Sequence, residues 1–121
     1  MGRISEVQHQ GKTILFQDFS RLHPGKEFRD AVVEGKRYMA SQPRKSVLSL
    51  VDATEAVYTS ETLAALKDYS KHNEPFVKAA AVLGIKGLLS VALMAISRFS
   101  GRTFKTFDDR AAAMDWLVAQ P

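Results

Sequence analysis

The stretch VKAAAVLGIKGLLSVALMAISRF, residues 77–99, constrains the fold of this chain more than any other feature. A transmembrane helix needs about 20 consecutive, predominantly apolar residues. Here Gly84 and Gly87 interrupt the run, and Lys86 lies near its middle, where a charge costs about 2.5–3.5 kcal/mol on insertion into a bilayer. The glycines instead divide the run into a strand over 76–85 and a helix that begins at Lys86 or Gly87. We therefore expect a strand followed by a helix, and no transmembrane segment.

Two strands, a helix and a third strand are expected before this run. A strand candidate at 4–7 and the β-prone sequence KTILFQDF at 12–19 lie on either side of Gly11, so we expect them to pair as a hairpin. A helix is predicted next, from apolar or small residues at helical spacing: Phe28, Ala31, Val32, Gly35 and Met39. The Val- and Leu-rich stretch SVLSLVDAT at 46–54 is typical of a buried strand.

Residues that favour helix ends set the limits of two helices. Pro24 is expected in the first turn of the first helix, and Pro43 ends that helix. Thr59 or Ser60 is expected to cap the next helix, because both side chains can accept a hydrogen bond from a free backbone N–H. The inner side of that helix is expected to carry Leu63, Leu66 and Tyr69.

The C-terminal part of the chain predicts one more strand and one more helix. RTFKTF alternates threonine and phenylalanine, which is typical of a half-buried strand. Asp108 is expected to cap the last helix. One face of that helix would carry Ala111, Met114, Leu117 and Val118, with Trp116 beside them.

The predicted order of elements is ββαβαβαβα, in which strands alternate with helices after an initial hairpin. This order predicts an α/β fold with a mainly parallel sheet, an antiparallel edge contributed by the N-terminal hairpin, and four helices. At 121 residues the chain is expected to form a single domain over 1–121. It has no cysteine and its first residues lack the apolar core of a signal peptide, so a cytoplasmic location is the expectation.

Charge and composition argue against a nucleic-acid partner. The chain has 17 Lys and Arg against 13 Asp and Glu, a net charge of +4. The basic residues are scattered among acidic ones, and no run of them alternates with aromatic residues that could stack on bases. We therefore interpret the basic excess as a solvated surface.

The predicted helix after GIKG carries more apolar residues than one buried face requires. A helix that lies on one sheet face needs a single apolar stripe. Neighbouring elements of the same chain could cover the surplus, or a lipid-like ligand, a partner helix or a second copy of the chain could cover it. The candidate surface consists of Leu88, Leu89, Leu93, Ile96 and Phe99.

Motifs that carry known chemistry are absent from the sequence. His9, His23 and His72 fall on different expected elements without metal-ligand spacing, so we predict no metal site. There is no G-x-S-x-G, Walker or G-x-G-x-x-G motif and no evident base–nucleophile pair. The sequence therefore predicts neither a cofactor nor a catalytic residue.

Four residues at strand ends could hold a polar group. Asp52 and Thr54 follow a buried strand, at the edge where ligands bind in parallel sheets. The Asp52 side chain could equally stabilise the turn by accepting from its own backbone. Lys86 and Gly87 lie in the expected strand-to-helix turn, which could hold one anion or could simply be tight because of its glycines.

Two stretches resemble a known group of proteins. VLSLVDATEAVYTSETLAALKDY is similar to the strand–turn–helix centre of STAS-type domains, the fold of anti-sigma-factor antagonists. The run over 77–99, together with FKTFDDRAAAMDWLV, resembles the SpoIIAA-like, or STAS/SEC14-like, small bacterial proteins. The resemblance implies a STAS-like fold over nearly the whole chain.

The resemblance also implies two functions, both non-enzymatic. SpoIIAA-like proteins are suspected of carrying non-polar ligands, which here implies a small apolar molecule or a lipid on the helix of Leu88 to Phe99. The alternative is a protein-interaction domain that is switched by phosphorylation at Thr59 or Ser60. The family motif Asp-Ser-Ser/Thr-Gly is replaced here by Thr-Ser-Glu-Thr, so the preceding acidic residue and the following glycine are missing. A homodimer through the apolar helix is compatible with either function.

Overall fold

The computed structural model describes residues 2–85 and 104–121 of the chain. Five strands form one mixed sheet in the order β1-β2-β3-β4-β5. Strands β1 and β2 pair antiparallel, and the other neighbouring pairs are parallel. The strands are β1 (Ile4–His9), β2 (Lys12–Asp18), β3 (Val47–Asp52), β4 (Val77–Leu83) and β5 (Phe104–Phe107). The expected parallel sheet with an antiparallel N-terminal hairpin at its edge is therefore confirmed.

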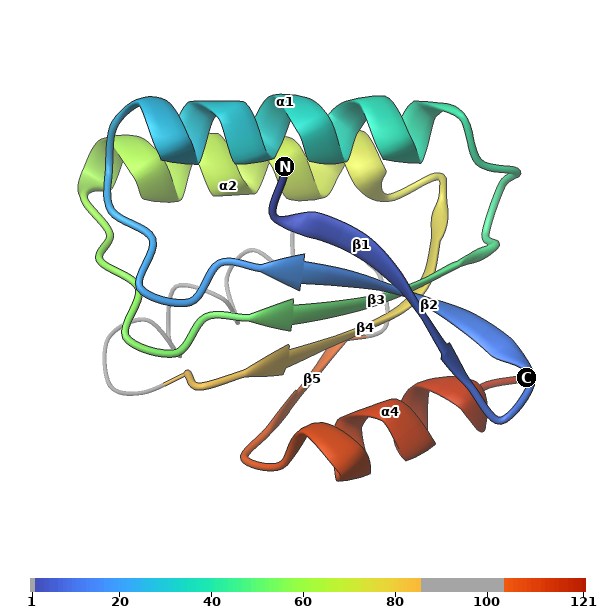
Figure 1. The fold of residues 1–121 in the computed structure, drawn as a ribbon. Helices are drawn as coiled ribbons and strands as arrows, with labels where there is room; N and C mark the ends of the chain where they lie inside the picture. Colours follow the sequence, from blue (N-terminus) through green and yellow to red (C-terminus); the bar gives the residue numbers. More distant parts are fainter. Residues whose placement is uncertain (1, 86–103) are drawn as a thin grey trace.

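The described helices lie on both faces of the sheet. Helices α1 (Lys26–Ala40) and α2 (Ser60–Asn73) run side by side over one face, and α4 (Arg110–Val118) lies on the other (Figure 1). The connections β2–α1–β3 and β3–α2–β4 step across the sheet in the same direction, so right-handed crossovers place both helices on the same face. Three of the four expected helices lie in the described residues, and the one expected from Lys86 or Gly87 onward lies outside them.

The two faces of the sheet bury separate apolar clusters because side chains alternate along each strand. Toward α1 and α2 the sheet presents Leu15, Val47 and Ala80, which pack with Met39 of α1. Toward α4 the buried residues are Ile14, Leu48, Leu50, Ala79, Ala81, Leu83, Ala113, Leu117 and Val118. The alanines of β4 allow close packing on both faces.

A buried polar contact joins α2 to the sheet beneath α1. The Tyr69 hydroxyl donates to Gln17 Oε1 at 2.5 Å, and Gln17 Nε2 donates to Ser49 Oγ at 2.8 Å. The Tyr69 ring crosses α1 at Gly35, where an added Cβ would overlap the hydroxyl oxygen and lie 2.6 Å from Cζ. Gly35 is therefore required by the close approach of α2.

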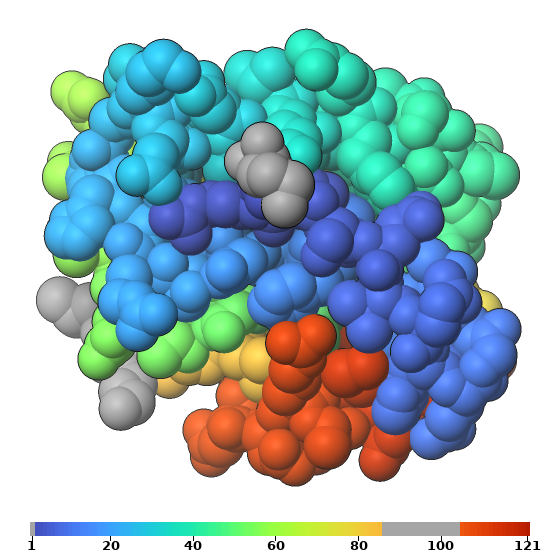
Figure 2. All heavy atoms as spheres, in the orientation of Figure 1, coloured from blue at the N-terminus to red at the C-terminus, as the bar shows by residue number. Residues whose placement is uncertain are grey.

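The hairpin also contacts α4. Figure 2 shows β1 and β2 crossing one face of the molecule between α1 and α4. His9 Nε2 lies 2.7 Å from Asp115 Oδ1, and Lys12 Nζ donates to the carbonyl oxygen of Val118 at 2.8 Å. The turn of the hairpin is thereby attached to the C-terminal helix.

Two of the expected helix starts are wrong by one or two residues. Helix α1 begins at Lys26, and Gly25 precedes it with a φ of 130°, a conformation that glycine adopts readily. The chain turns at this glycine, so Pro24 lies outside the helix rather than in its first turn. Asp109, not Asp108, caps α4 by accepting from the backbone N–H groups of the second and third helical residues.

The buried face of α4 also differs from the expected one. Ala111 is exposed, contrary to expectation, whereas Ala113 is completely buried against the sheet. Ala113 precedes Leu117 by four residues and therefore lies on the same face of the helix, whereas Ala111 lies in the exposed first turn. Leu117 and Val118 are buried as expected.

Candidate functional site

The carboxyl ends of β2 and β3 carry the same turn. Asp18 and Asp52 are in register at the ends of the two parallel strands. The Asp18 carboxylate accepts from the backbone N–H and the hydroxyl of Ser20, at 3.1 and 2.5 Å. The Asp52 carboxylate accepts from the same groups of Thr54, at 3.0 and 2.6 Å. The turn-stabilising alternative for Asp52 is thus present in the structure, and it is duplicated on the neighbouring strand.

The duplication extends to the next residue of each turn. Arg21 and Glu55 follow the two hydroxyl residues, and both have positive φ, 53° and 57°. Their side chains approach to 3.7 Å across the edge. Sequence reasoning identified Asp52 and Thr54 but missed the matching turn of β2. The repeated pattern Asp-x-Ser/Thr at the ends of two strands is the signal that could have identified it.

Backbone hydrogen bonds hold these turns together. Phe19 N donates to the carbonyl of Asp52, and Arg21 N donates to the carbonyl of Thr54, at 2.9 and 2.8 Å. Gly84, at the end of β4, has a φ of 76° and packs against the same turn. A Cβ on it would lie 2.6 Å from the Thr54 Cα. The sheet edge is therefore a connected surface built from the ends of three adjacent strands.

Charged groups surround the first of the two turns. The hydrogen bond from the Ser20 hydroxyl is the largest effect on the pKa of Asp18, and it lowers that pKa. Partial burial raises the pKa, whereas the Ser20 N–H and the nearby Arg3 and Arg21 lower it further. The Arg3 guanidinium donates to the carbonyl oxygens of Asp18 and Ser20 and pairs with Glu27 at 2.8 Å. These groups border an open hollow of about 610 Å³. Because the hollow contains charges of both signs, it does not select an ion of either sign.

Helix α2 begins beside this edge. Thr59 is its N-cap: the Thr59 hydroxyl accepts from the N–H of Thr62 at 3.2 Å, and the Thr62 side chain accepts from the N–H of Thr59 at 2.8 Å. Ser60 is the first helical residue and is exposed. Its hydroxyl makes no hydrogen bond to any residue in 2–85 or 104–121. The two candidate phosphorylation positions therefore differ, because one hydroxyl is engaged in the cap and the other is free.

The loop that leads to this helix start combines apolar and buried groups. Val57 is 43% exposed, which is unusual for a large apolar side chain among the described residues. Burial raises the pKa of the adjacent Tyr58 to about 12. The surface next to Ser60 thus offers an exposed apolar side chain beside a free hydroxyl.

Several candidate residues lie outside the described part of the chain. They are Lys86, Gly87, Leu88, Leu89, Leu93, Ile96 and Phe99. The expected apolar ligand or dimer surface and the expected anion-binding turn therefore have no structural description here, apart from Gly84 at the start of that turn. Asp52, Thr54, Thr59 and Ser60 are described, and the fold brings all four to the carboxyl end of β3.

The histidines occupy separate places. His9 lies on the hairpin against Asp115, His23 is exposed in the loop before α1, and His72 lies 2.9 Å from Asn73 Oδ1 near the end of α2. Within 2–85 and 104–121 no group of three metal-ligating side chains could hold a metal ion. In the same residues, no helix is long and apolar enough to cross a membrane.

The sheet order and the placement of the helices define a SpoIIAA-like α/β fold. An uncharacterized protein of the DUF3478 family from Shewanella loihica PV-4, described as having a SpoIIAA-like fold, is similar in structure, with a TM-score of 0.76. The similarity covers 94% of this chain and 91% of that chain at 20% sequence identity, so it concerns the fold. No protein-family model and no curated protein matches the sequence. The fold expected from the sequence resemblance is thereby confirmed.

Proposed function

We propose that this protein is a non-enzymatic regulatory domain that binds a protein partner at the carboxyl edge of its sheet, and that phosphorylation of Ser60 controls the binding. The observation that carries the proposal is the exposed hydroxyl of Ser60 at the start of α2, which makes no hydrogen bond to the part of the chain that the structure describes. It lies next to an edge that the paired turns of Asp18 and Asp52 and the backbone bonds between them hold in place.

The surroundings of Ser60 favour it over Thr59 as the modified residue. The Thr59 hydroxyl is part of the helix cap, and loss of such a cap costs about 0.5–2 kcal/mol. A phosphate on Ser60 leaves this cap intact and lies at a helix N-terminus, where backbone N–H groups and the helix dipole favour negative charge. Glu61, the next residue, is also acidic and opposes a second negative charge.

A phosphate at this position would change the partner surface directly. It adds about 1.5 to 2 negative charges near neutral pH. The neighbouring loop presents the exposed side chain of Val57, and an apolar contact there becomes less favourable beside a dianion. We therefore expect phosphorylation to release a partner that binds the unmodified edge.

Phosphosite mapping and retention of a partner together test this proposal. The protein is purified from its own cells, its phosphorylated residues are mapped, and the proteins that co-purify with wild type, Ser60→Ala and Ser60→Asp are compared. Ser41→Ala, an exposed serine at the opposite end of the fold, is the matched control. The expected result is phosphate on Ser60 and a partner retained by Ser60→Ala and the control but lost from Ser60→Asp. Absence of phosphate from both Thr59 and Ser60, with the same partners for all variants, would refute it.

An apolar ligand on the segment of Leu88 to Phe99 remains a second proposal, supported by the surplus of apolar residues in that sequence. Native mass spectrometry of gently purified protein tests it independently of Ser60. A bound lipid or small apolar molecule, lost on Leu89→Ser/Leu93→Ser substitution, is the expected result. A clean apo mass at every protein concentration would count against it.

A further inference from the structure

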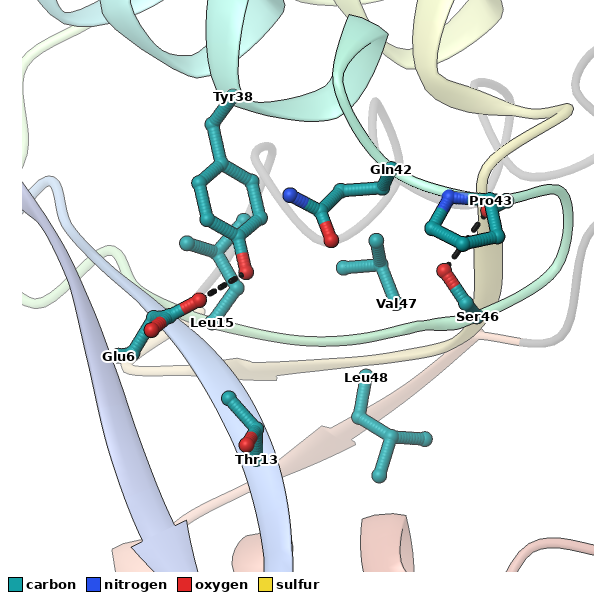
Figure 3. A pocket seen from close by; sticks show the side chains of 9 residues that line it. All are labelled: Glu6, Thr13, Leu15, Tyr38, Gln42, Pro43, Ser46, Val47 and Leu48. Carbon is teal, nitrogen blue, oxygen red and sulfur yellow. Dashed lines mark hydrogen bonds between the residues drawn. The ribbon is translucent and has the colours of Figure 1, made fainter.

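A second hollow lies at the amino edge of the sheet, at the opposite end of β3 from Ser60. It has a volume of about 230 Å³ and lies between the hairpin, the end of α1 and the start of β3 (Figure 3). Such a volume holds roughly seven waters at about 30 Å³ each, and is smaller than the roughly 300–1,000 Å³ of drug-sized sites. Its lining residues are Glu6, Thr13, Leu15, Tyr38, Gln42, Pro43, Ser46, Val47 and Leu48.

The hydrogen-bond donors of this pocket are largely engaged within the protein. The Tyr38 hydroxyl donates to Glu6 Oε2 at 2.8 Å, and the Ser46 hydroxyl donates to the carbonyl of Pro43 at 2.7 Å (Figure 3). Gln42 Nε2 donates to the hydroxyl of Ser41 at 3.0 Å. An incoming anion or carbonyl group would therefore find few free donors.

Two acceptor oxygens of the pocket are not engaged by the described residues, whereas Glu6 Oε2 accepts from Tyr38 and Thr13 Oγ1 accepts from Gln8. Neither Glu6 Oε1 nor Gln42 Oε1 accepts a hydrogen bond from the residues that the structure describes. Figure 3 shows the Gln42 amide oxygen on the side of the pocket floor. Glu6 takes part in no ion pair with a described residue, and no lysine or arginine is among the described lining residues. At the exposed rim of the pocket, Glu6 thus presents a carboxylate that no described residue neutralises, and Gln42 presents an amide oxygen that accepts from no described residue.

The Tyr38 side chain connects Glu6 to the wall of the pocket. Desolvation, followed by the hydrogen bond and the charge of Glu6, raises the pKa of Tyr38 to about 12. The tyrosine ring also forms one wall of the pocket (Figure 3). An aromatic face attracts a cation within about 6 Å of its centroid, so the ring and the carboxylate favour the same ligand charge.

The floor of the pocket is apolar. Leu15 and Val47 are buried, at 1% and 5% exposure, and both face the α1 side of the sheet. These two side chains close the bottom of the pocket but leave little surface to contact, so the carbon atoms of a ligand whose charged end meets Glu6 lie against the Tyr38 ring and Pro43 at its sides. The limited volume restricts that apolar part to a short chain.

We infer that this pocket binds a primary ammonium group on a short alkyl chain, with Glu6 and Gln42 accepting its N–H donors and the Tyr38 ring and Pro43 contacting its carbons. Such a group occurs both in small free amines and in the side chain of a lysine on another protein. The inferred site does not depend on Ser60, and its experiment leaves the proposed function untouched.

Chemical-shift titration of the ¹⁵N-labelled protein tests the inference. The probes are n-butylamine and n-butanol, which have the same chain length and differ in charge at neutral pH. We expect saturable shifts of the backbone amides of Leu15, Val47 and Leu48 with a millimolar dissociation constant for the amine. The alcohol is expected to bind at least tenfold more weakly, because it lacks the charge-assisted contact.

Three variants separate the site from general attraction to surface carboxylates. Glu6→Gln keeps the shape and removes the charge, and is expected to weaken amine binding roughly tenfold, the loss of one charged hydrogen bond. Tyr38→Phe keeps the aromatic ring, which supplies the cation–π attraction, and frees Glu6 Oε2. Its affinity for the amine is therefore expected to stay within about twofold of wild type or to improve. Glu61→Gln, an exposed glutamate on α2, is the matched control and is expected to bind like wild type.

The result that overturns the inference is an amine titration that fails to saturate, or one that Glu6→Gln leaves unchanged. Well-dispersed spectra of each variant establish that it is folded. Nα-acetyl-lysine-N-methylamide, titrated in parallel, distinguishes the two sources of the ammonium group. Binding as tight as that of n-butylamine indicates a protein lysine, and tenfold weaker binding indicates a free amine.

Discussion

The packing of Tyr69 over Gly35 predicts how Gly35→Ala changes the stability of the protein. Tertiary packing and helix propensity predict changes of opposite sign. Glycine in the interior of a helix is less favourable than alanine by about 1 kcal/mol. If α1 were isolated at this position, Gly35→Ala would therefore stabilise the protein. The structure predicts the opposite, because an added methyl group would overlap the Tyr69 side chain.

The expected cost follows from two consequences of the overlap. Inserting a methyl group into a packed interior costs about 1–3 kcal/mol. Movement of the tyrosine to relieve the overlap adds a second cost, because its hydroxyl and Gln17 then lose their mutual hydrogen bond, and the loss of such a buried bond costs about 1–3 kcal/mol. After subtraction of the propensity gain, we expect Gly35→Ala to lower the free energy of unfolding by about 1–5 kcal/mol.

Urea denaturation measures this loss directly. With a slope of about 2 kcal/mol per molar urea for a chain of this size, a loss of about 3 kcal/mol lowers the midpoint by about 1.5 M. Val33→Ala, at an exposed position on the same helix, is the control and should change stability by less than about 0.5 kcal/mol. In a Tyr69→Phe background the added cost of Gly35→Ala should fall by about 1 kcal/mol, because the hydrogen bond is already lost. A Gly35→Ala protein more stable than wild type would refute the close approach of α2 to α1.

Three further predictions concern the carboxyl edge. Gly84→Ala combines a positive φ with a Cβ placed 2.6 Å from the Thr54 Cα, so it should lower the free energy of unfolding by about 2–4 kcal/mol; an unchanged urea midpoint would contradict this. Thr59→Ala removes the cap of α2 and should cost about 1 kcal/mol, whereas Thr59→Ser should cost a few tenths; equal costs by the same assay would mean that the hydroxyl does not cap the helix. The pKa of Asp18 lies below its usual value of 3.8, chiefly because the Ser20 hydroxyl donates to it. A carboxyl group whose pKa is lowered in the folded state stabilises the fold at pH values above its unfolded pKa, and this stabilisation is lost as pH falls through its folded pKa. Asp18→Asn should therefore lower the free energy of unfolding at pH 7, and the variant should match wild type near pH 2. A pH-independent difference would contradict the assignment.

The sequence predicted the elements well where a pattern repeated over many residues. The runs that became β3 and β4 are apolar at most positions because α1, α2 and α4 cover both faces of the sheet. Single-residue features were less reliable. Asp108 and Asp109 are both good caps in isolation, and the choice between them depends on how α4 sits on the sheet.

The candidate site was predicted in part. Asp52 and Thr54 stood out because they end a strongly apolar strand. Asp18 and Ser20 did not, because β2 has a polar residue at its buried Gln17 and its end looked like an ordinary turn. Only the register of β2 with β3 shows that the two aspartates end neighbouring strands in the same way.

By itself, the order of apolar and polar residues determined a mainly parallel sheet with an N-terminal hairpin, together with the helices α1, α2 and α4. These features follow from the sequence because secondary-structure periods and turn residues are local properties of a chain. Contacts between distant segments were decided by the tertiary structure alone. Gly35 beneath Tyr69, and Glu6 beside Tyr38 at the amino-edge pocket, are separated by more than thirty residues. No local pattern encodes such pairs, because their distance depends on how all the intervening elements pack.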